Sequence, residues 1–222
     1  MTHTSFIMGK TKGECLMIID ESTARAAIKK NIKVYNRRLE TMNHQARYGK
    51  KSRKGWLKKI RAVIEKTSWV VDCVVDKQYI HYYALMPADD HFASKIFTLN
   101  SKTMHFDNCN LNFVFTNHFI ARLMQYKKSV VLSDLTADMS WIMDILFSLN
   151  KFTSGNHHNS GNYRLYADKI GFIPAVFNKE DEQEIFIVKT LIPPSVMGEK
   201  HWSHYEPLIG TDGVSMERVE YH

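Results

Sequence analysis

Cysteine is scarce in this sequence of 222 residues, and long apolar runs are missing from it. The three cysteines, Cys15, Cys73 and Cys109, are scattered, so they predict neither a disulfide framework nor a zinc site with paired ligands. No apolar run approaches the roughly 18 residues needed to cross a membrane. Residues 1–20 contain no long apolar stretch and no small-residue cleavage site, so we expect no secretory signal. Together these absences favour a cytoplasmic protein with reduced thiols.

Motifs of the common cofactor and enzyme classes are also missing. The sequence has no phosphate-binding glycine-rich loop, no nucleophile elbow and no dinucleotide fingerprint. His201 and His204 have a spacing that suits a transition metal, but no cysteine or acid accompanies them at a telling distance. We therefore expect neither a metal nor a cofactor.

Positive charge is present in excess and is distributed unevenly. The whole chain has a net charge of +7. Residues 29–66 contain fourteen Lys or Arg and two acids, a net charge of +12, which leaves −5 for the rest of the chain. The sequence therefore predicts a strongly basic segment on a mildly acidic body.

The basic segment also has the apolar periodicity of helices. Apolar residues recur every three or four positions from Ile28 to Ala46, which predicts one long helix over residues 21–48 that begins at an Asp20 or Ser22 cap. A second helix is expected from Ser52 or Trp56 to residue 66, after a linker with two glycines. The two helices form an α-hairpin in the simplest arrangement.

Elements with a period of two precede and follow two further helices. We expect a strand at residues 15–20, hairpins at 68–76 with 78–86 and 94–100 with 103–107, and a strand at 110–115. Helices are expected from Thr116 or Asn117 to residue 128 and over residues 133–150, followed by a loop at 151–162. Strands at 163–168, 171–178 and 184–193 close an antiparallel sheet. This order predicts an α+β fold, with residues 1–66 as the basic hairpin unit and 67–222 as the core domain.

The basic hairpin is the principal candidate for a binding surface. Lys29, Lys33 and Arg37 stand at i, i+4 and i+8 and stack in one row, where like charges destabilise the helix. A polyanion relieves this crowding, so we expect phosphate contacts from the basic residues of the hairpin, namely Lys29, Lys33, Arg37, Arg38, Lys50, Lys51, Arg53, Lys54, Lys58, Lys59 and Arg61. The alternatives are a solvated helix face and contact with an acidic protein or a membrane surface. We expect no membrane contact, because the apolar seam suits packing on the body; the same seam leaves a monomer or a homodimer open.

A candidate chemical site lies in the helix that begins near Asn117. His118 and Arg122 are four residues apart, which places an imidazole and a guanidinium side by side on one helical face. Histidine can move a proton near neutral pH, and arginine can clamp a phosphate through two hydrogen bonds. Metal-independent cleavage of RNA needs both functions, so RNA is favoured over DNA as the polymer. Lys189 and Thr190 are further candidate phosphate contacts.

These residues resemble a known group of enzymes. The pieces N117-H118-F119-I120-A121-R122-L123, G171-F172-I173 and V188-K189-T190 are similar to the layout of barnase–colicin–RelE-type toxin domains, over residues 115–193. The resemblance implies a metal-independent endoribonuclease with His118, Arg122, Lys189 and Thr190 in the active site. A second histidine or a tyrosine often completes such sites, which leaves His105, His157, His158 and Tyr163 open for that role.

Structural roles explain the same residues. A single histidine on a helix is commonly a cap or a packed residue, and Arg122 can pair with Asp134 or Asp138. Tyr79, Tyr82 and Tyr83 on an expected strand either stack on bases or pack in the core. The sequence therefore supports an RNA-cleaving toxin, a non-catalytic regulatory or phage-type protein that binds nucleic acid, and a module that binds an acidic protein partner.

Overall fold

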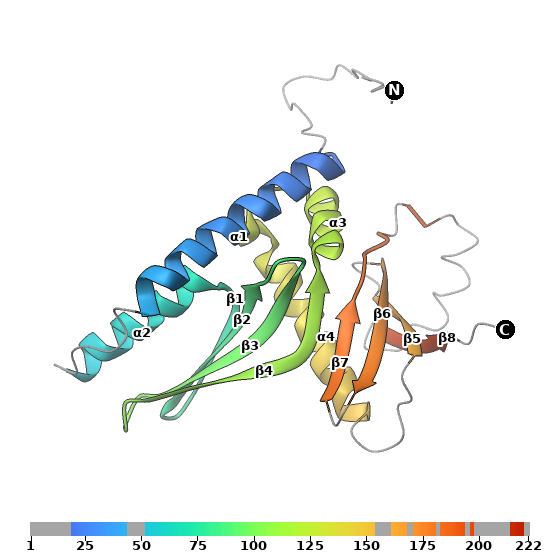
Figure 1. Cartoon of the computed structure of the whole chain (residues 1–222). Helices are drawn as coiled ribbons and strands as arrows, with labels where there is room; N and C mark the ends of the chain where they lie inside the picture. The colour runs from blue at the N-terminus through green and yellow to red at the C-terminus, as the bar shows by residue number, and fades with distance from the viewer. Residues whose placement is uncertain are drawn as a thin grey trace, which may run out of the picture.

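The chain folds into helices and strands that alternate in groups (Figure 1). The computed structural model describes residues 19–43, 52–153, 161–167, 171–180, 183–193, 196–197 and 214–219. The helices are α1 (Glu21–Asn43), α2 (Arg53–Thr67), α3 (Asn117–Lys127), the 3-10 helix η1 (Leu132–Leu135) and α4 (Thr136–Thr153). The strands are β1 (Trp69–Asp76), β2 (Tyr79–Pro87), β3 (His91–Asn100), β4 (His105–Thr116), β5 (Gly161–Ala167), β6 (Gly171–Glu180), β7 (Gln183–Val188) and β8 (Val214–Val219). The fold is α+β, as the sequence predicts.

The strands of the described residues form one mixed sheet in the order β1-β2-β3-β4-β7-β6-β5-β8. Its neighbours are antiparallel except β4 and β7, which run parallel from the Phe113–Phe186 pair to the Phe115–Val188 pair. This parallel pairing joins the early hairpins to the late ones, so the late strands extend the same sheet.

Helices cover both faces of the sheet. On one face α2 packs Trp56, Ile60 and Ile64 against a cluster that includes Tyr82 and Phe97. The opposite face carries the main core, in which α1, α3 and α4 contribute buried side chains. Neighbouring residues in a strand point to opposite faces. Accordingly, Tyr82 faces α2, whereas Tyr83 makes an edge contact with Phe147 of α4 at 5.4 Å between ring centroids.

The basic helix α1 is anchored by its own sequence pattern. The carboxylate of Asp20 accepts a hydrogen bond from the Thr23 amide at 2.7 Å, which caps the first turn as predicted. Ala24, Ile28 and Ile32 are buried in the main core, and α1 contacts α3, α2 and β2. The described part of the helix therefore confirms the predicted apolar seam through Ile28, Ile32 and the half-buried Tyr35. Residues 44–48, and residues 15–18 of the predicted first strand, lie outside the described residues.

Several predicted boundaries are wrong. Residues 105–107 and 110–115 belong to the single strand β4, which pairs with β3 on both sides of a register shift between Ala93 and Lys95, whereas residues 103–104 lie in the preceding turn. The fourth helix begins at Thr136 after the η1 turn, and it continues through Thr153 into the predicted 151–162 loop. Strand β7 ends at Val188, and only an isolated bridge between Phe172 and Ile192 follows it within the predicted 184–193 strand. The predicted unit boundary at residue 66 stays a prediction.

Candidate nucleic-acid interface

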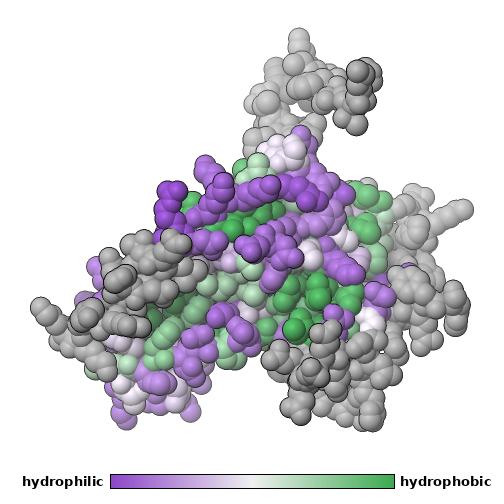
Figure 2. All heavy atoms as spheres, viewed as in Figure 1, coloured by the Kyte–Doolittle hydropathy of each residue, from purple (hydrophilic) through white to green (hydrophobic). Residues whose placement is uncertain are grey.

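The outer face of α1 carries lysine and arginine side chains because its inner face is fixed by packing. Ile28 and Ile32 point into the core, and a helix repeats every 3.6 residues. Lys29, Lys30 and Lys33 must then point outward, and all three are exposed. Figure 2 shows hydrophilic residues along the length of α1. The packing of one stripe thus exposes the predicted basic row.

Several cations of the outer face of α1 have no acidic partner in the part of the chain that the structure describes. Among the described residues, no ion pair joins Lys29, Lys30, Lys33 or Arg38 to a carboxylate. At the first turn of α1, by contrast, Arg25 Nη2 lies 2.6 Å from Glu21 Oε1. Like charges four residues apart on a helix repel one another by a few tenths of a kcal/mol per pair. Binding of an anion would relieve this repulsion.

An open hollow lies between these side chains. It has a volume of about 680 Å³, and the described residues that line it are Ala26, Lys29, Lys30, Lys33, Val34, Arg37 and Arg38. Two of them, Ala26 and Val34, are apolar, and the remaining five are cationic. No acid is among the described lining residues. Drug-sized ligands are usually enclosed on most of their surface. A hollow whose described lining belongs to one exposed helix instead suits an extended anion that passes across it.

The second helix, α2, adds exposed lysines and two arginines that already have partners. Ser52 caps α2 by accepting a hydrogen bond from the Gly55 amide at 3.1 Å, and Lys54 and Lys58 are exposed. Arg53 donates to Ser101 Oγ at 3.0 Å, which ties α2 to the turn between β3 and β4. Arg61 pairs with the Glu65 carboxylate at 2.6 Å.

The remaining residues of the predicted surface differ in exposure. Lys59 is half-buried, whereas Arg37 and Arg38 are exposed on α1. Lys50 and Lys51 lie outside the described residues. Arg61 is less available to a phosphate, because the Glu65 carboxylate already pairs with it.

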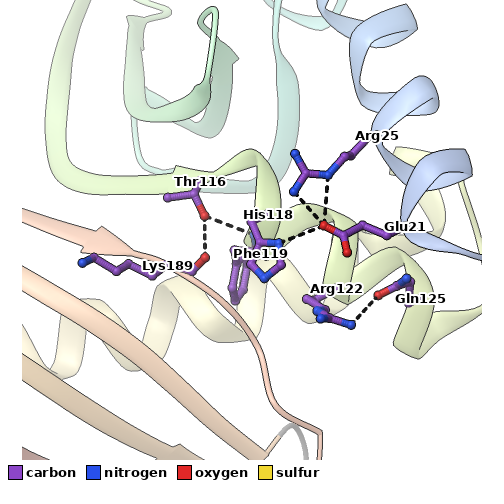
Figure 3. A network of polar contacts seen from close by, with 8 residues as sticks. All are labelled: Glu21, Arg25, Thr116, His118, Phe119, Arg122, Gln125 and Lys189. Atoms are coloured by element: carbon purple, nitrogen blue, oxygen red, sulfur yellow. Dashed lines mark hydrogen bonds and ion pairs between the residues drawn. The ribbon is translucent and has the colours of Figure 1, made fainter. Parts of the chain in front are cut away.

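The candidate chemical residues meet the first turn of α1 (Figure 3). His118 Nδ1 lies 3.4 Å from Glu21 Oε1, and the same oxygen accepts the Arg25 guanidinium. The hydrogen bond from Arg25 holds the pKa of Glu21 below its ordinary value, and the charges of His118 and Arg122 act in the same direction. Arg122 itself donates to Gln125 Oε1 at 3.1 Å. The arrangement joins an imidazole, a carboxylate and two guanidinium groups at one surface.

An ion pair of Arg122 with Asp134 or Asp138, the structural role considered for this arginine, is not found among the described residues. Asp138 pairs with Lys127 at 3.1 Å, and Asp134 accepts a hydrogen bond from Ser129. Thr116 caps α3 by accepting from the Phe119 amide at 3.1 Å, so His118 is not the capping residue. His118 lies within the first turn of α3, with 37% of its side chain exposed.

Lys189 and Thr190 approach α3 through the backbone. Thr116 Oγ1 donates to the Lys189 carbonyl at 2.6 Å, which holds the end of β7 beside the start of α3. The amine of Lys189 extends away from His118 in Figure 3. Thr190 is half-buried directly after it. The structure thus brings His118 and Arg122 together, and brings only the main chain of Lys189 next to them.

Two of the four residues left open as a second histidine or tyrosine, His105 and Tyr163, are described, and neither lies beside His118. His105 begins β4 and Thr116 ends it, so the length of the strand, about 36 Å along its path at 3.3 Å per residue, lies between His105 and the start of α3. Tyr163 is buried, with its ring 6.2 Å from Phe177 and 6.0 Å from Phe186. His157 and His158 lie outside the described residues.

Sequence reasoning missed Glu21 and Arg25 as neighbours of His118. Both residues are ordinary in a first helical turn, and the ion pair between them has the common i, i+4 spacing. Their contact with α3 is long-range, so no local pattern indicates it. A second unexpected pair is Asp72 on β1 and Asp144 on α4: burial and the charge of Asp72 raise the pKa of Asp144.

Metal and membrane features are absent from the part of the chain that the structure describes. Its histidines, cysteines and acids form no group of three that could hold a metal ion. None of its helices combines the length and the apolar character that a membrane crossing requires.

Comparisons with other proteins identify no relative. No protein-family model matches the chain, and no curated protein or solved structure is significantly similar to it. The resemblance of residues 115–193 to metal-independent ribonuclease toxins therefore stays a prediction.

Proposed function

We propose that this protein binds nucleic acid through the basic face of α1, with Lys54 and Lys58 of α2 as further contacts. The observation that carries the proposal is the row of exposed lysines that no described carboxylate neutralises. A polyanion binds such a row by releasing its condensed counterions, which is the main source of affinity in sequence-independent nucleic-acid binding. Phosphate contacts of this kind position the polymer and do not read its sequence.

The hollow on α1 supports a polymer over a small anion. The described residues that line the hollow all belong to α1, and their long side chains surround an open surface. A mononucleotide would remain largely solvated there, whereas a polymer can engage several cations at once. Several weak contacts made by one molecule add up without the entropy cost of separate binding events.

Retention on labelled RNA and DNA in EDTA, at low and at high salt, tests the proposal. We expect the protein to retain both polymers at low salt and to release them as the salt rises. The variant Lys29→Glu/Lys30→Glu/Lys33→Glu should lose retention while its far-UV circular dichroism stays that of the wild type. Unchanged retention would show that α1 is not the contact surface. Failure to retain either polymer, together with capture of an acidic protein, would favour the acidic-partner alternative.

RNA cleavage is a second candidate function, favoured by the contact between His118 and Glu21. A carboxylate beside an imidazole can hold the ring in place for proton transfer, and Arg25 and Arg122 can meet the charge that develops on a phosphate. The same incubation provides the test. Metal-independent products that disappear in His118→Ala, with binding retained, would support cleavage. Intact RNA after prolonged incubation with saturating protein would leave binding as the function.

A further inference from the structure

The cations of α1 spread around the helix as well as along it. At about 100° per residue, Lys29, Lys33 and Arg37 lie at roughly 0°, 40° and 80° around the axis, and Lys30 and Arg38 lie at roughly 100° and 180°. The buried stripe of α1 lies on the other side of the axis. Cationic side chains therefore cover about half of the circumference and flank the helix on both sides.

This spread suits a groove with phosphates on both walls. An α-helix with its side chains is about 10–12 Å across, and the major groove of B-form DNA is about 12 Å wide and admits one helix. A helix whose cations lie along one line can contact the phosphates of only one strand of the duplex. Lys29 and Arg38 lie on opposite flanks of α1, so they can reach both walls. Figure 1 shows α1 along the outer edge of the molecule, where a duplex can approach it.

The described part of the basic hairpin lacks the exposed aromatic rings of single-strand recognition. Proteins that hold single strands stack bases on exposed aromatic rings. In the described part of the hairpin, Trp56 is buried against the sheet, and Tyr35 is half-buried against the core, where burial raises its pKa. The exposed Tyr79 is on β2 and, by strand alternation, faces away from the side that α2 covers.

Duplex RNA fits this helix less well than duplex DNA. The A-form major groove of RNA is deep and narrow, and side chains cannot read it. Its wide minor groove is shallow, so it offers no pair of phosphate walls to a helix with cations on both flanks.

We infer that the polymer is B-form double-stranded DNA, with α1 lying in the major groove and holding the backbone on both walls. The inference rests on the proposed function, because it names the form of nucleic acid that the same face takes. Lys29 and Lys33 meet one wall, Arg38 meets the other, and Lys30, which lies midway between the flanks, can reach either wall. Recognition is through phosphates and is independent of sequence.

The test measures equilibrium binding by fluorescence anisotropy, in EDTA, to one sequence prepared as duplex DNA, duplex RNA, single-stranded DNA and single-stranded RNA. We expect duplex DNA to bind at least about tenfold more tightly than the other three, and an unrelated duplex DNA to bind equally well. The variants Lys29→Gln and Arg38→Gln, one on each flank, should each weaken binding to duplex DNA. An effect confined to one flank would overturn the two-walled placement.

Competing dyes identify the groove. Methyl green occupies the major groove and netropsin the minor groove, and both are cationic. We expect methyl green to displace the protein and netropsin to leave it bound. Displacement by netropsin alone, or single strands or duplex RNA that bind as tightly as duplex DNA, would overturn the inference while the proposed function stands. No binding to any of the four polymers would overturn the proposed function itself.

Discussion

Neutralising two lysines of the basic row should weaken nucleic-acid binding by a calculable amount. The variant Lys29→Gln/Lys33→Gln removes two positive charges but keeps long polar side chains, and glutamine has a helix propensity close to that of lysine. Each phosphate that a protein neutralises on B-form DNA contributes about 0.9 to the slope of log K against log salt concentration. At about 0.1 M salt, that slope corresponds to about an eightfold loss of affinity per contact.

Two lost contacts should therefore reduce affinity about 60-fold, or about 2.4 kcal/mol, and should make the slope shallower by about 1.8. Stability should move in the opposite direction. Removal of the repulsion between exposed lysines four residues apart should stabilise α1 by a few tenths of a kcal/mol. Weaker binding together with higher stability is expected if these lysines serve binding at the expense of helix stability. Lysines with a purely structural role would not give this combination.

The assay is fluorescence anisotropy with labelled duplex DNA over a series of salt concentrations, combined with thermal unfolding. The matched control is Lys77→Gln/Lys128→Gln, which removes the same charge from the β1–β2 turn and from the residue after α3. The reasoning is refuted by an unchanged slope in the Lys29/Lys33 variant. It is refuted equally by a control that loses as much affinity as that variant.

Three further predictions concern stability and are each measured by thermal or urea unfolding. Ser52→Ala removes the hydroxyl that accepts a hydrogen bond from the Gly55 amide, and it should lower the free energy of unfolding by about 1 kcal/mol. An unchanged unfolding midpoint would contradict this expectation. Leu123→Ala at a fully buried position should cost about 2–5 kcal/mol, and a cost below 1 kcal/mol would show a loosely packed core there. Asp144 has a raised pKa because of burial and Asp72, so its ionised form destabilises the fold above its unfolded pKa. Asp144→Asn should accordingly raise the unfolding midpoint at pH 7 and have no effect once the pH falls below the ordinary range of an aspartate, and a lower midpoint at pH 7 would contradict this.

Local features of the fold were predictable from the sequence because their causes are local. The Asp20 cap, the apolar seam through Ile28 and Ile32 and the Thr116 cap of α3 depend on residues within one or two turns of each other. The first hairpin was predictable for the same reason, because two apolar runs flank a short turn at Lys77.

The polar middle of β4 misled the prediction because its residues favour turns. Asp107, Asn108 and Asn110 are typical of loops, so the pattern suggested a break between two strands. In the structure these residues pair with β3 across the ladder, for example Asn108 with Phe97. Tertiary pairing overrides local preference here.

The features that the sequence did not predict depend on contacts between residues far apart in the chain. The parallel pairing of β4 with β7 joins residues that are far apart in the chain, and no turn signal marks it. The contact of Glu21 with His118 has the same origin, so the sequence indicated the imidazole and the guanidinium without the carboxylate beside them. The basic row was predictable because its charge is given by its residues and its exposure follows from helical periodicity.

Lysine footprinting tests the central claim most directly. The protein is acetylated under mild conditions with and without duplex DNA, and modification at each lysine is measured by mass spectrometry. We predict that DNA protects Lys29, Lys30 and Lys33 while Lys77 and Lys128 react at the same rate in both samples. Equal reactivity of the three α1 lysines in the presence and absence of bound DNA would contradict a nucleic-acid interface on this helix.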